Sequence, residues 1–190
     1  MEELNSRQKQ AKLLRGLRKI HRTTGVFLFV FFAIVAITGG LLGWKKHSAG
    51  LLLARSHTGT STNLAEWLPL DSLQRNAITF LKDSISPELS TAIDRMEVRQ
   101  DKGMLKITFK DHYWGLQLDG VSGKLLHIER RNADIIEQLH DASMLDALLH
   151  TSDGQIKRMY TTLMSLALLV FVVTGFWLWY GPRKMRKLQP

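Results

Sequence analysis

The stretch from Thr23 to Trp44 constrains the fold of this chain most strongly, because it holds 22 residues without a formal charge. At about 1.5 Å per residue it makes roughly 33 Å of helix, enough to cross a hydrocarbon core of about 30 Å. A second charge-free run covers the 24 residues from Met159 to Pro182, and three of its last residues are aromatic. Aromatic rings favour the membrane–water interface. We therefore expect transmembrane helices at residues 23–44 and 159–182.

The net charge of +9 is concentrated at the two ends of the chain. Seven Lys and Arg residues and two Glu precede Thr23, four Lys and Arg follow Pro182, and the 15 basic and 15 acidic residues between the runs cancel. A basic excess marks the cytoplasmic side of a membrane. The expected location is the bacterial inner membrane, with both termini cytoplasmic and the central domain periplasmic. Nucleic-acid binding is the other interpretation of basic ends, but membrane flanks explain their placement completely.

Residues 64–132 predict a small α+β domain between the two runs. Apolar residues at helical spacing indicate a helix over Leu70–Lys82. From Ile93 onward the apolar period becomes two, with turns at residues 101–103 and 119–124, which is typical of an antiparallel sheet. One face of this sheet is polar and the other apolar, and the helix is expected to pack on the apolar face.

The expected fold class is an α+β membrane protein, in which two transmembrane helices flank one extracytoplasmic domain. The remaining segments connect these parts. We expect a cytoplasmic basic amphipathic segment at 1–22, a linker at 45–63, an amphipathic helix (133–149) and connector within 133–158, and a cytoplasmic basic tail at 183–190.

The chain contains no cysteine. This excludes disulfides, covalently attached haem, iron–sulfur clusters and thiol catalysis. The motifs G-x-S-x-G and H-E-x-x-H and a phosphate-binding glycine loop are also missing from the sequence. We therefore predict no catalytic side chain, and the lack of a nicotinamide or flavin motif means that electrons would come from a separate partner.

Histidines near the ends of the spans are the candidate cofactor ligands. They are His21, His47, His140 and His150. A b-type haem needs one or two imidazoles from facing helices and no cysteine. His21 and His47 would lie about 39 Å apart on an unbroken helix, so they cannot share one haem. The alternative is that these are boundary residues whose polar edges stay hydrated.

The two spans share a short sequence, because Thr38-Gly39 in the first recurs as Thr174-Gly175 in the second. Since the spans run in opposite directions, the two pairs are expected at opposite depths. Chance is the alternative explanation, because Thr and Gly are common in spans. Gly39 also forms a GxxxG pair with Gly43, and small residues of this kind let helix backbones approach closely.

Three stretches of the sequence resemble the PepSY-associated transmembrane family. KIHRTTGVFLFVFFAIVAITGGLL resembles its first helix, LHDASMLDALLH with LMSLALLVFVVTGFWLWYGPRK its closing segment, and WGLQLDGVSGKLLHI the PepSY strand–turn–strand. The resemblance covers about residues 18–187. It favours His21 and His140 as metal ligands over His47 and His150. Leu149-His150 repeats the Leu-His pair of the motif, but the LHD context favours His140.

The resemblance implies a membrane-bound and often iron-linked protein. Larger relatives with four spans are similar to haem-containing inner-membrane reductases of ferric siderophores, which hold b-type haems through histidines at helix ends. A chain with two spans would need to form a homodimer to build the same four-helix bundle.

Two classes of function follow from these observations. The first is a homodimeric electron-transfer protein that binds haem b, a candidate ferric reductase acting on a ferric siderophore. The second is a non-enzymatic PepSY module that binds a partner protein or inhibits a protease, or an accessory subunit of a metal uptake system. Bound haem in the purified protein would distinguish them.

Overall fold

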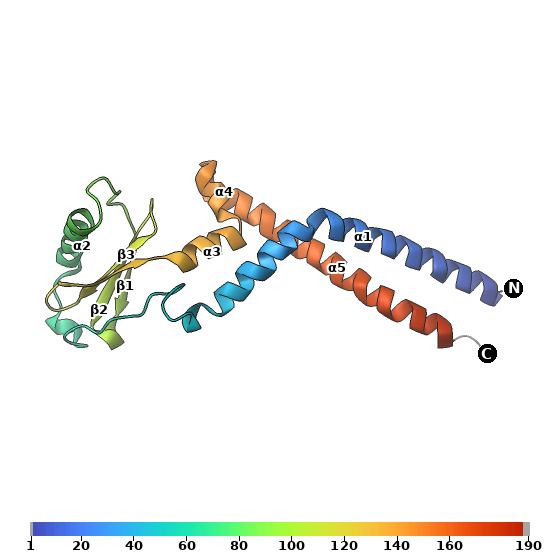
Figure 1. Ribbon diagram of the computed structural model, residues 1–190, viewed down its shortest axis with the longest axis horizontal. Coiled ribbons are helices and arrows are strands. Elements are labelled where there is room, and N and C mark those ends of the chain that lie inside the picture. Colours follow the sequence, from blue (N-terminus) through green and yellow to red (C-terminus); the bar gives the residue numbers. More distant parts are fainter. Residues whose placement is uncertain (1, 188–190) are drawn as a thin grey trace. The chain divides into compact units, whose positions relative to one another are not determined.

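The computed structural model describes residues 2–187. The chain forms two compact units, one made of Met1–Gly39 with Gln138–Pro190 and the other of Gly40–Glu137. Figure 1 shows the helices and strands in chain order. They are α1 (Glu2–Gly43), α2 (Leu70–Ser84), β1 (Ile93–Arg99), β2 (Met104–Phe109), β3 (Trp114–Asp119), β4 (Leu125–Arg130), α3 (Asn132–His140), α4 (Ser143–Leu148) and α5 (Gln155–Lys187).

The two predicted spans are present as the long helices α1 and α5. Each contains a stretch that is long and apolar enough to cross a membrane, Gln8–Gly43 in α1 and Gln155–Arg186 in α5. Many of their apolar side chains are exposed, and Phe27 keeps 79% of its surface. Large exposed apolar surfaces of this kind are unfavourable in water and are compatible with lipid.

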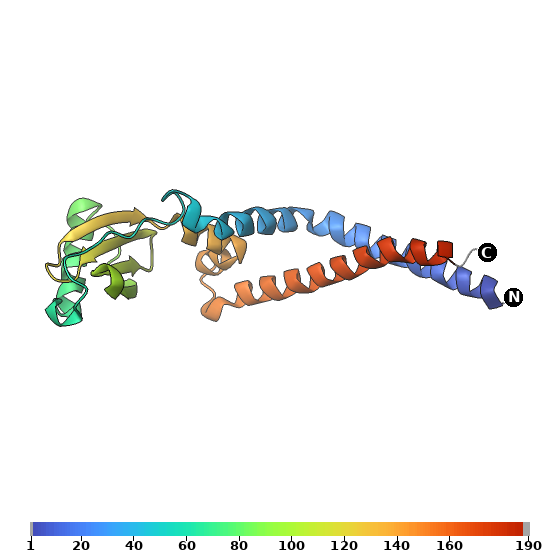
Figure 2. The same ribbon diagram turned by 90° about the horizontal axis from the view of Figure 1, so that it is seen from below.

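Within the first unit, α1 packs antiparallel to α5. Leu14 approaches Gly181, His21 approaches Gly175, and Gly25 approaches Phe171. The α5 residues at this contact are spaced three and four apart, as in coiled-coil packing: Met164, Ala167, Phe171 and Thr174. The N-terminal end of α1 and the C-terminal end of α5 therefore lie at the same end of the pair, as both views show (Figure 1 and Figure 2).

The basic segment at residues 1–22 is continuous with the first span, because α1 begins at Glu2. One of its apolar residues, Leu14, is buried against Gly181 of α5. The structure therefore places at least this part of the expected amphipathic segment against a second helix. The reason is that Gly181, near the end of the second apolar run, packs against α1 before the start of the first run at Thr23.

The structure divides the expected helix at 133–149 into α3 and α4. Ala142, between the two, has a left-handed backbone with φ of 60°. The carboxylate of Asp141 accepts a hydrogen bond from the N–H of Ser143 at 2.9 Å. An Asp that bonds the backbone two residues later offers an alternative to helical pairing, and this explains why the helix ends at His140.

The second unit contains the predicted α+β domain, with an antiparallel sheet in the order β1-β2-β3-β4. The predicted packing of the helix on the apolar face is confirmed, because α2 buries one side of itself there. The fully buried residues of this core are Leu73, Ala77, Leu81, Leu105, Ile107, Phe109, Leu116 and Leu118. Alternation along β2 and β3 places these side chains on one face of the sheet.

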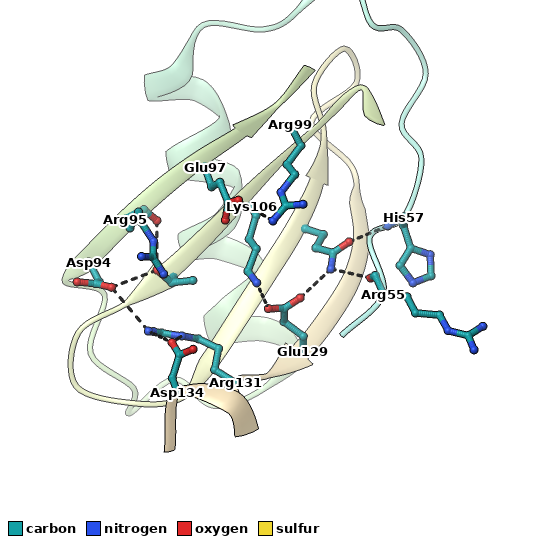
Figure 3. A network of polar contacts seen from close by, with 12 residues as sticks. Arg55, His57, Asp94, Arg95, Glu97, Arg99, Lys106, Glu129, Arg131 and Asp134 are labelled. Atoms are coloured by element: carbon teal, nitrogen blue, oxygen red, sulfur yellow. Dashed lines mark hydrogen bonds and ion pairs between the residues drawn. The ribbon is translucent and has the colours of Figure 1, made fainter. Parts of the chain in front are cut away.

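The opposite face of the sheet is polar yet buried. Glu129, which is only 4% exposed, accepts hydrogen bonds from Lys106 at 2.5 Å and from Gln117 at 2.7 Å. Gln117 in turn accepts from the backbone N–H of His57 and donates to the carbonyl of Arg55. Figure 3 shows these contacts on the face away from α2. Part of the segment expected as a linker therefore covers this face.

The carboxylate of Asp119 holds the same covering segment a few residues further along the chain, at Thr60. Its carboxylate accepts hydrogen bonds from the N–H and hydroxyl of Thr60, at 3.0 and 2.5 Å, and from the hydroxyl of Ser122 at 2.7 Å. Burial alone would raise the pKa of Asp119, but these bonds and one from the N–H of Val121 lower it to about 2. Next to Thr60, a side chain at Gly59 would meet the carbonyl of Gly103 at 2.0 Å, so only glycine fits this approach.

Replacing Asp119 by asparagine is expected to destabilise this domain by about 2 kcal/mol at neutral pH, because the amide cannot accept the same set of bonds. The folded-state pKa of about 2 lies below the unfolded value of 3.8. The stabilisation is therefore complete above the unfolded pKa and is lost as the pH falls through about 2. Thermal unfolding of wild type and variant between pH 7 and 2 would check this. A stability difference that stays constant with pH would contradict it.

Candidate functional site

His21 meets the Thr-Gly pair of the second span. Its Nδ1 lies 2.9 Å from the hydroxyl of Thr174. A Cβ at Gly175 would lie 3.3 Å from the imidazole Cε1, so glycine leaves the room that the ring occupies. The other side of the ring stacks on Phe171, with ring centroids 3.9 Å apart. The imidazole is thus held by three residues of α5.

His140 meets the Thr-Gly pair of the first span in the same way. Its Nδ1 lies 2.8 Å from the hydroxyl of Thr38. A Cβ at Gly39 would lie 3.4 Å from the imidazole Cε1. The two histidines are therefore related by a repeated unit of His, Thr and Gly, in which the histidine comes from one segment and the Thr-Gly pair from the other span.

The hydrogen bonds of the two threonines favour one tautomer of each imidazole. Each hydroxyl donates to the carbonyl four residues earlier, at 2.6 Å from Thr38 to Ile34 and at 2.7 Å from Thr174 to Val170. A hydroxyl has one proton, so a threonine that donates to this carbonyl accepts from the Nδ1–H of the histidine. In that arrangement Nδ1 carries the hydrogen and Nε2 keeps its lone pair. A histidine with a bonded Nδ1–H and a free Nε2 is oriented as a metal ligand.

The two His–Thr–Gly units lie at opposite ends of the pair formed by α1 and α5. Thr38 belongs to the His140 unit and His21 to the other, and both are on α1. At about 1.5 Å per residue the helix rises roughly 25 Å between these positions. Both threonines are buried, with 4% of their surface exposed. Threonines that bond back to their own helix are common in membrane helices, so the contact with a histidine is what distinguishes these two.

Two aspartates tie the segment that follows His140 to the start of α5. Asp146 accepts hydrogen bonds from the N–H groups of Ile156 and Lys157, at 2.9 and 2.8 Å, and another from Thr151. The Thr151 bond is the main reason why the pKa of Asp146 is lowered. Asp141 pairs with the Lys157 ammonium at 2.6 Å. These contacts cap α5 and hold the chain next to His140 in a fixed position.

The other two candidate ligands lack this environment. His47 is exposed in a short 3₁₀ turn, with its ring edge-on to Trp44. His150 is also exposed and has a positive φ of 50°. Among the described residues, no hydrogen bond or ring contact joins His21 to His140. Within residues 2–187 it also contains no group of three His, Asp or Glu side chains that could hold a metal ion.

An apolar cavity of about 200 Å³ adjoins the His140 unit. Its lining includes Leu139 and Ala142, which flank His140 on either side, and Ile34, whose carbonyl binds Thr38. Phe31 and Tyr160 from the two spans complete much of the wall. Chain neighbours of His140 therefore line an apolar space formed by α1, α3, α4 and α5.

The comparison with protein families bears on the same stretch of chain. The model of the PepSY-associated TM region matches residues 18–189, which include both histidine units and the sheet. This chain belongs to the PepSY-associated transmembrane family. A search of curated proteins found no match. The membership and the two long helices confirm the predicted fold class, a membrane protein with an α+β domain between its spans.

In this PepSY-associated protein, the sequence indicated the histidines but not their partners. His21 and His140 were candidates by position, and the repeated Thr-Gly pair was visible as a sequence. What joins them is contact over 153 and 102 residues. The signal available in the sequence was the depth of these residues. Thr174-Gly175 of the second span is at the depth of His21, and Thr38-Gly39 of the first span is at the depth of His140.

Proposed function

We propose that this protein binds b-type haem through His21 and His140 and moves electrons across the bacterial inner membrane as a homodimer. The domain between the spans is placed in the periplasm and both termini in the cytoplasm, following the basic excess at the two ends. The proposed activity is reduction of ferric iron held by a siderophore. The repeated His–Thr–Gly unit is the observation that carries this proposal.

The residues present fit haem by the chemistry of their donor atoms. With the hydrogen on Nδ1, the Nε2 atoms of His21 and of His140 have a free lone pair, and the ring hydrogen bonds that the described residues give these histidines are both made by Nδ1. The Nδ1–H bond to threonine is the kind of outer contact that fixes a ligating imidazole. A haem held here would supply reversible one-electron redox chemistry. Phe171 covers one face of the His21 ring, and chain neighbours of His140 line the apolar cavity.

The depth of the two units supports transfer across the membrane. They are separated by roughly 25 Å along α1, which is close to the thickness of the hydrocarbon core. His21 lies among Arg18, Lys19 and Arg22 on the proposed cytoplasmic side. His140 lies at the other end, where the chain enters the periplasmic domain. The chain thus offers one ligand position near each surface of the bilayer.

We propose a homodimer because each His–Thr–Gly unit offers only one imidazole and an incomplete wall for a haem. One chain presents a single imidazole at each depth, whereas b-type haems between helices commonly take two. The apolar cavity of about 200 Å³ is smaller than the 300–1,000 Å³ typical of sites for organic ligands. A second copy would contribute both the missing imidazole and the missing wall, and the pair of chains would form a four-helix bundle.

Absorbance spectroscopy of the full-length protein tests the proposal. Protein purified in mild detergent from haem-supplied cells is expected to show a Soret band, about one haem per chain, and sharp α and β bands on reduction. Adding a ferric siderophore to the reduced protein should reoxidise it. A colourless, folded protein under these conditions would contradict haem binding and favour the non-enzymatic PepSY module or an accessory role in metal uptake.

A further inference from the structure

The compact unit formed by Gly40–Glu137 contains a cavity of about 540 Å³ whose charged lining is entirely basic. It lies between the chain that follows the first span and the end of β1. Its lining includes Lys46, His47, Arg55 and Arg99. Three of these side chains are permanently cationic and one is an imidazole, while none is a carboxylate.

This concentration of charge is local. The residues between the two spans contain 15 Lys and Arg and 15 Asp and Glu, so the region as a whole is neutral. Neither Lys46 nor Arg55 has an ion-pair partner among the described residues. The charges of these two side chains are therefore not compensated by an ion pair, and a bound anion would supply the counter-charge.

Arg99 supplies an independent observation. Its Nη2 pairs with Glu97 at 2.6 Å, but its Nε is buried and lacks a hydrogen-bond acceptor among the described residues. Figure 3 shows this pair at the end of β1. A buried donor without an acceptor costs about 1–3 kcal/mol. Arg99 also lines the cavity, so its guanidinium adds a third cation to the site.

The wall of the cavity is held in place by hydrogen bonds on both sides. Ser48 accepts from the N–H of Leu52 at 3.0 Å, and the carbonyl of Leu52 accepts from the N–H of Ala133 at 3.0 Å. The carbonyl of Arg55 accepts from the buried Gln117 at 3.0 Å. The segment therefore does not have to become ordered when a ligand binds, which reduces the entropic cost of binding.

We infer that this cavity binds a small polyanion through its carboxylate or phosphate oxygens. Its volume lies within the range for organic ligands of about 300–1,000 Å³ and exceeds what a single phosphate ion needs. Lysine and arginine are the side chains that bind such oxygens most strongly. Two sources share this chemistry: a soluble anionic ferric chelate, or the headgroup of an anionic phospholipid, since Lys46 follows the first span directly. The choice of a ferric chelate as the ligand rests on the proposed function. The inference that the cavity binds an anion does not.

Calorimetric titration of the full-length protein with ferric citrate tests the soluble source. The double variant Lys46→Gln, Arg55→Gln is expected to weaken binding at least ~10-fold, and Arg99→Gln to weaken it further. The matched control is Arg75→Gln, Lys82→Gln on α2, which removes the same charge from an exposed surface. This control should leave the affinity unchanged. The affinity should also fall as ionic strength rises.

Native mass spectrometry of the same proteins tests the lipid source. In nanodiscs with phosphatidylglycerol, wild type should retain this lipid and the double variant should lose it, while phosphatidylcholine is retained by neither. Loss of either ligand in the cavity variants alone supports the inference and identifies the source. Equal binding by cavity and control variants, or no binding by wild type, overturns it. Haem content separates the proposals: a red protein without anion binding contradicts only this inference, and a colourless protein that binds the anion contradicts only the haem proposal.

Discussion

Replacing His140 by alanine is expected to remove about half of the haem bound per chain, and replacing His21 should remove the other half. The reason is that each imidazole belongs to a separate unit, roughly 25 Å from the other along α1. The double variant should be colourless. Haem per chain, measured as the pyridine haemochrome, checks this expectation. Far-UV circular dichroism would confirm that the helices remain.

The matched controls for this experiment are His47→Ala and His150→Ala. Both residues are exposed, and neither has a threonine bonded to its ring. They are expected to keep the wild-type haem content. Loss of haem in either control, with full haem in the His21 or His140 variants, would show that the ligand assignment is wrong even if the protein binds haem.

Replacing Thr38 by valine is expected to weaken haem binding at the His140 unit by 10- to 100-fold, the usual effect of losing an outer hydrogen bond to a metal-bound histidine. Valine has nearly the shape of threonine but cannot accept from Nδ1–H. Thr174→Val should have the same effect at the His21 unit only. Because the two units are far apart, the effects should be independent. Thr38→Ser and Thr174→Ser keep the hydroxyl and are expected to bind haem nearly as wild type does.

The protonation of the imidazoles gives a second measurement that does not require haem. In the haem-free protein, nitrogen NMR should show His21 and His140 with the hydrogen on Nδ1. The valine variants should shift the affected histidine toward a mixture of the two tautomers, and the serine variants should not. Unchanged tautomers and unchanged haem affinity in the valine variants would show that the threonines serve packing alone.

Local sequence determined most of the fold. Two charge-free runs of 22 and 24 residues leave helices in lipid as the stable solution, and the structure has helices there. A period of two along residues 104–119 places Leu105, Ile107 and Leu116 on one face, where α2 covers them. These features depend on neighbouring residues only, so one sequence is sufficient to predict them.

The polar face of the sheet could not be predicted in this way. Gln117 and Glu129 alternate with apolar residues as solvent-facing side chains do, yet they are 1% and 4% exposed. They are covered by a segment about sixty residues earlier, through the backbone of Arg55 and His57. Nothing in the local pattern indicates that a polar loop will lie on a polar face.

The sequence by itself determined that this chain has two membrane helices, an α+β domain between them, and histidines near the ends of the spans. It also contained the two Thr-Gly pairs. Only the tertiary structure decided that His21 and His140, and not His47 and His150, meet those pairs. The physical reason is that the partnership depends on the register of antiparallel packing between α1 and α5 and on the fixed turn after α3. The register is set by contacts between residues more than 100 positions apart in the chain. The turn is set by the contacts of Asp141 and Asp146 with Ser143 and with the start of α5.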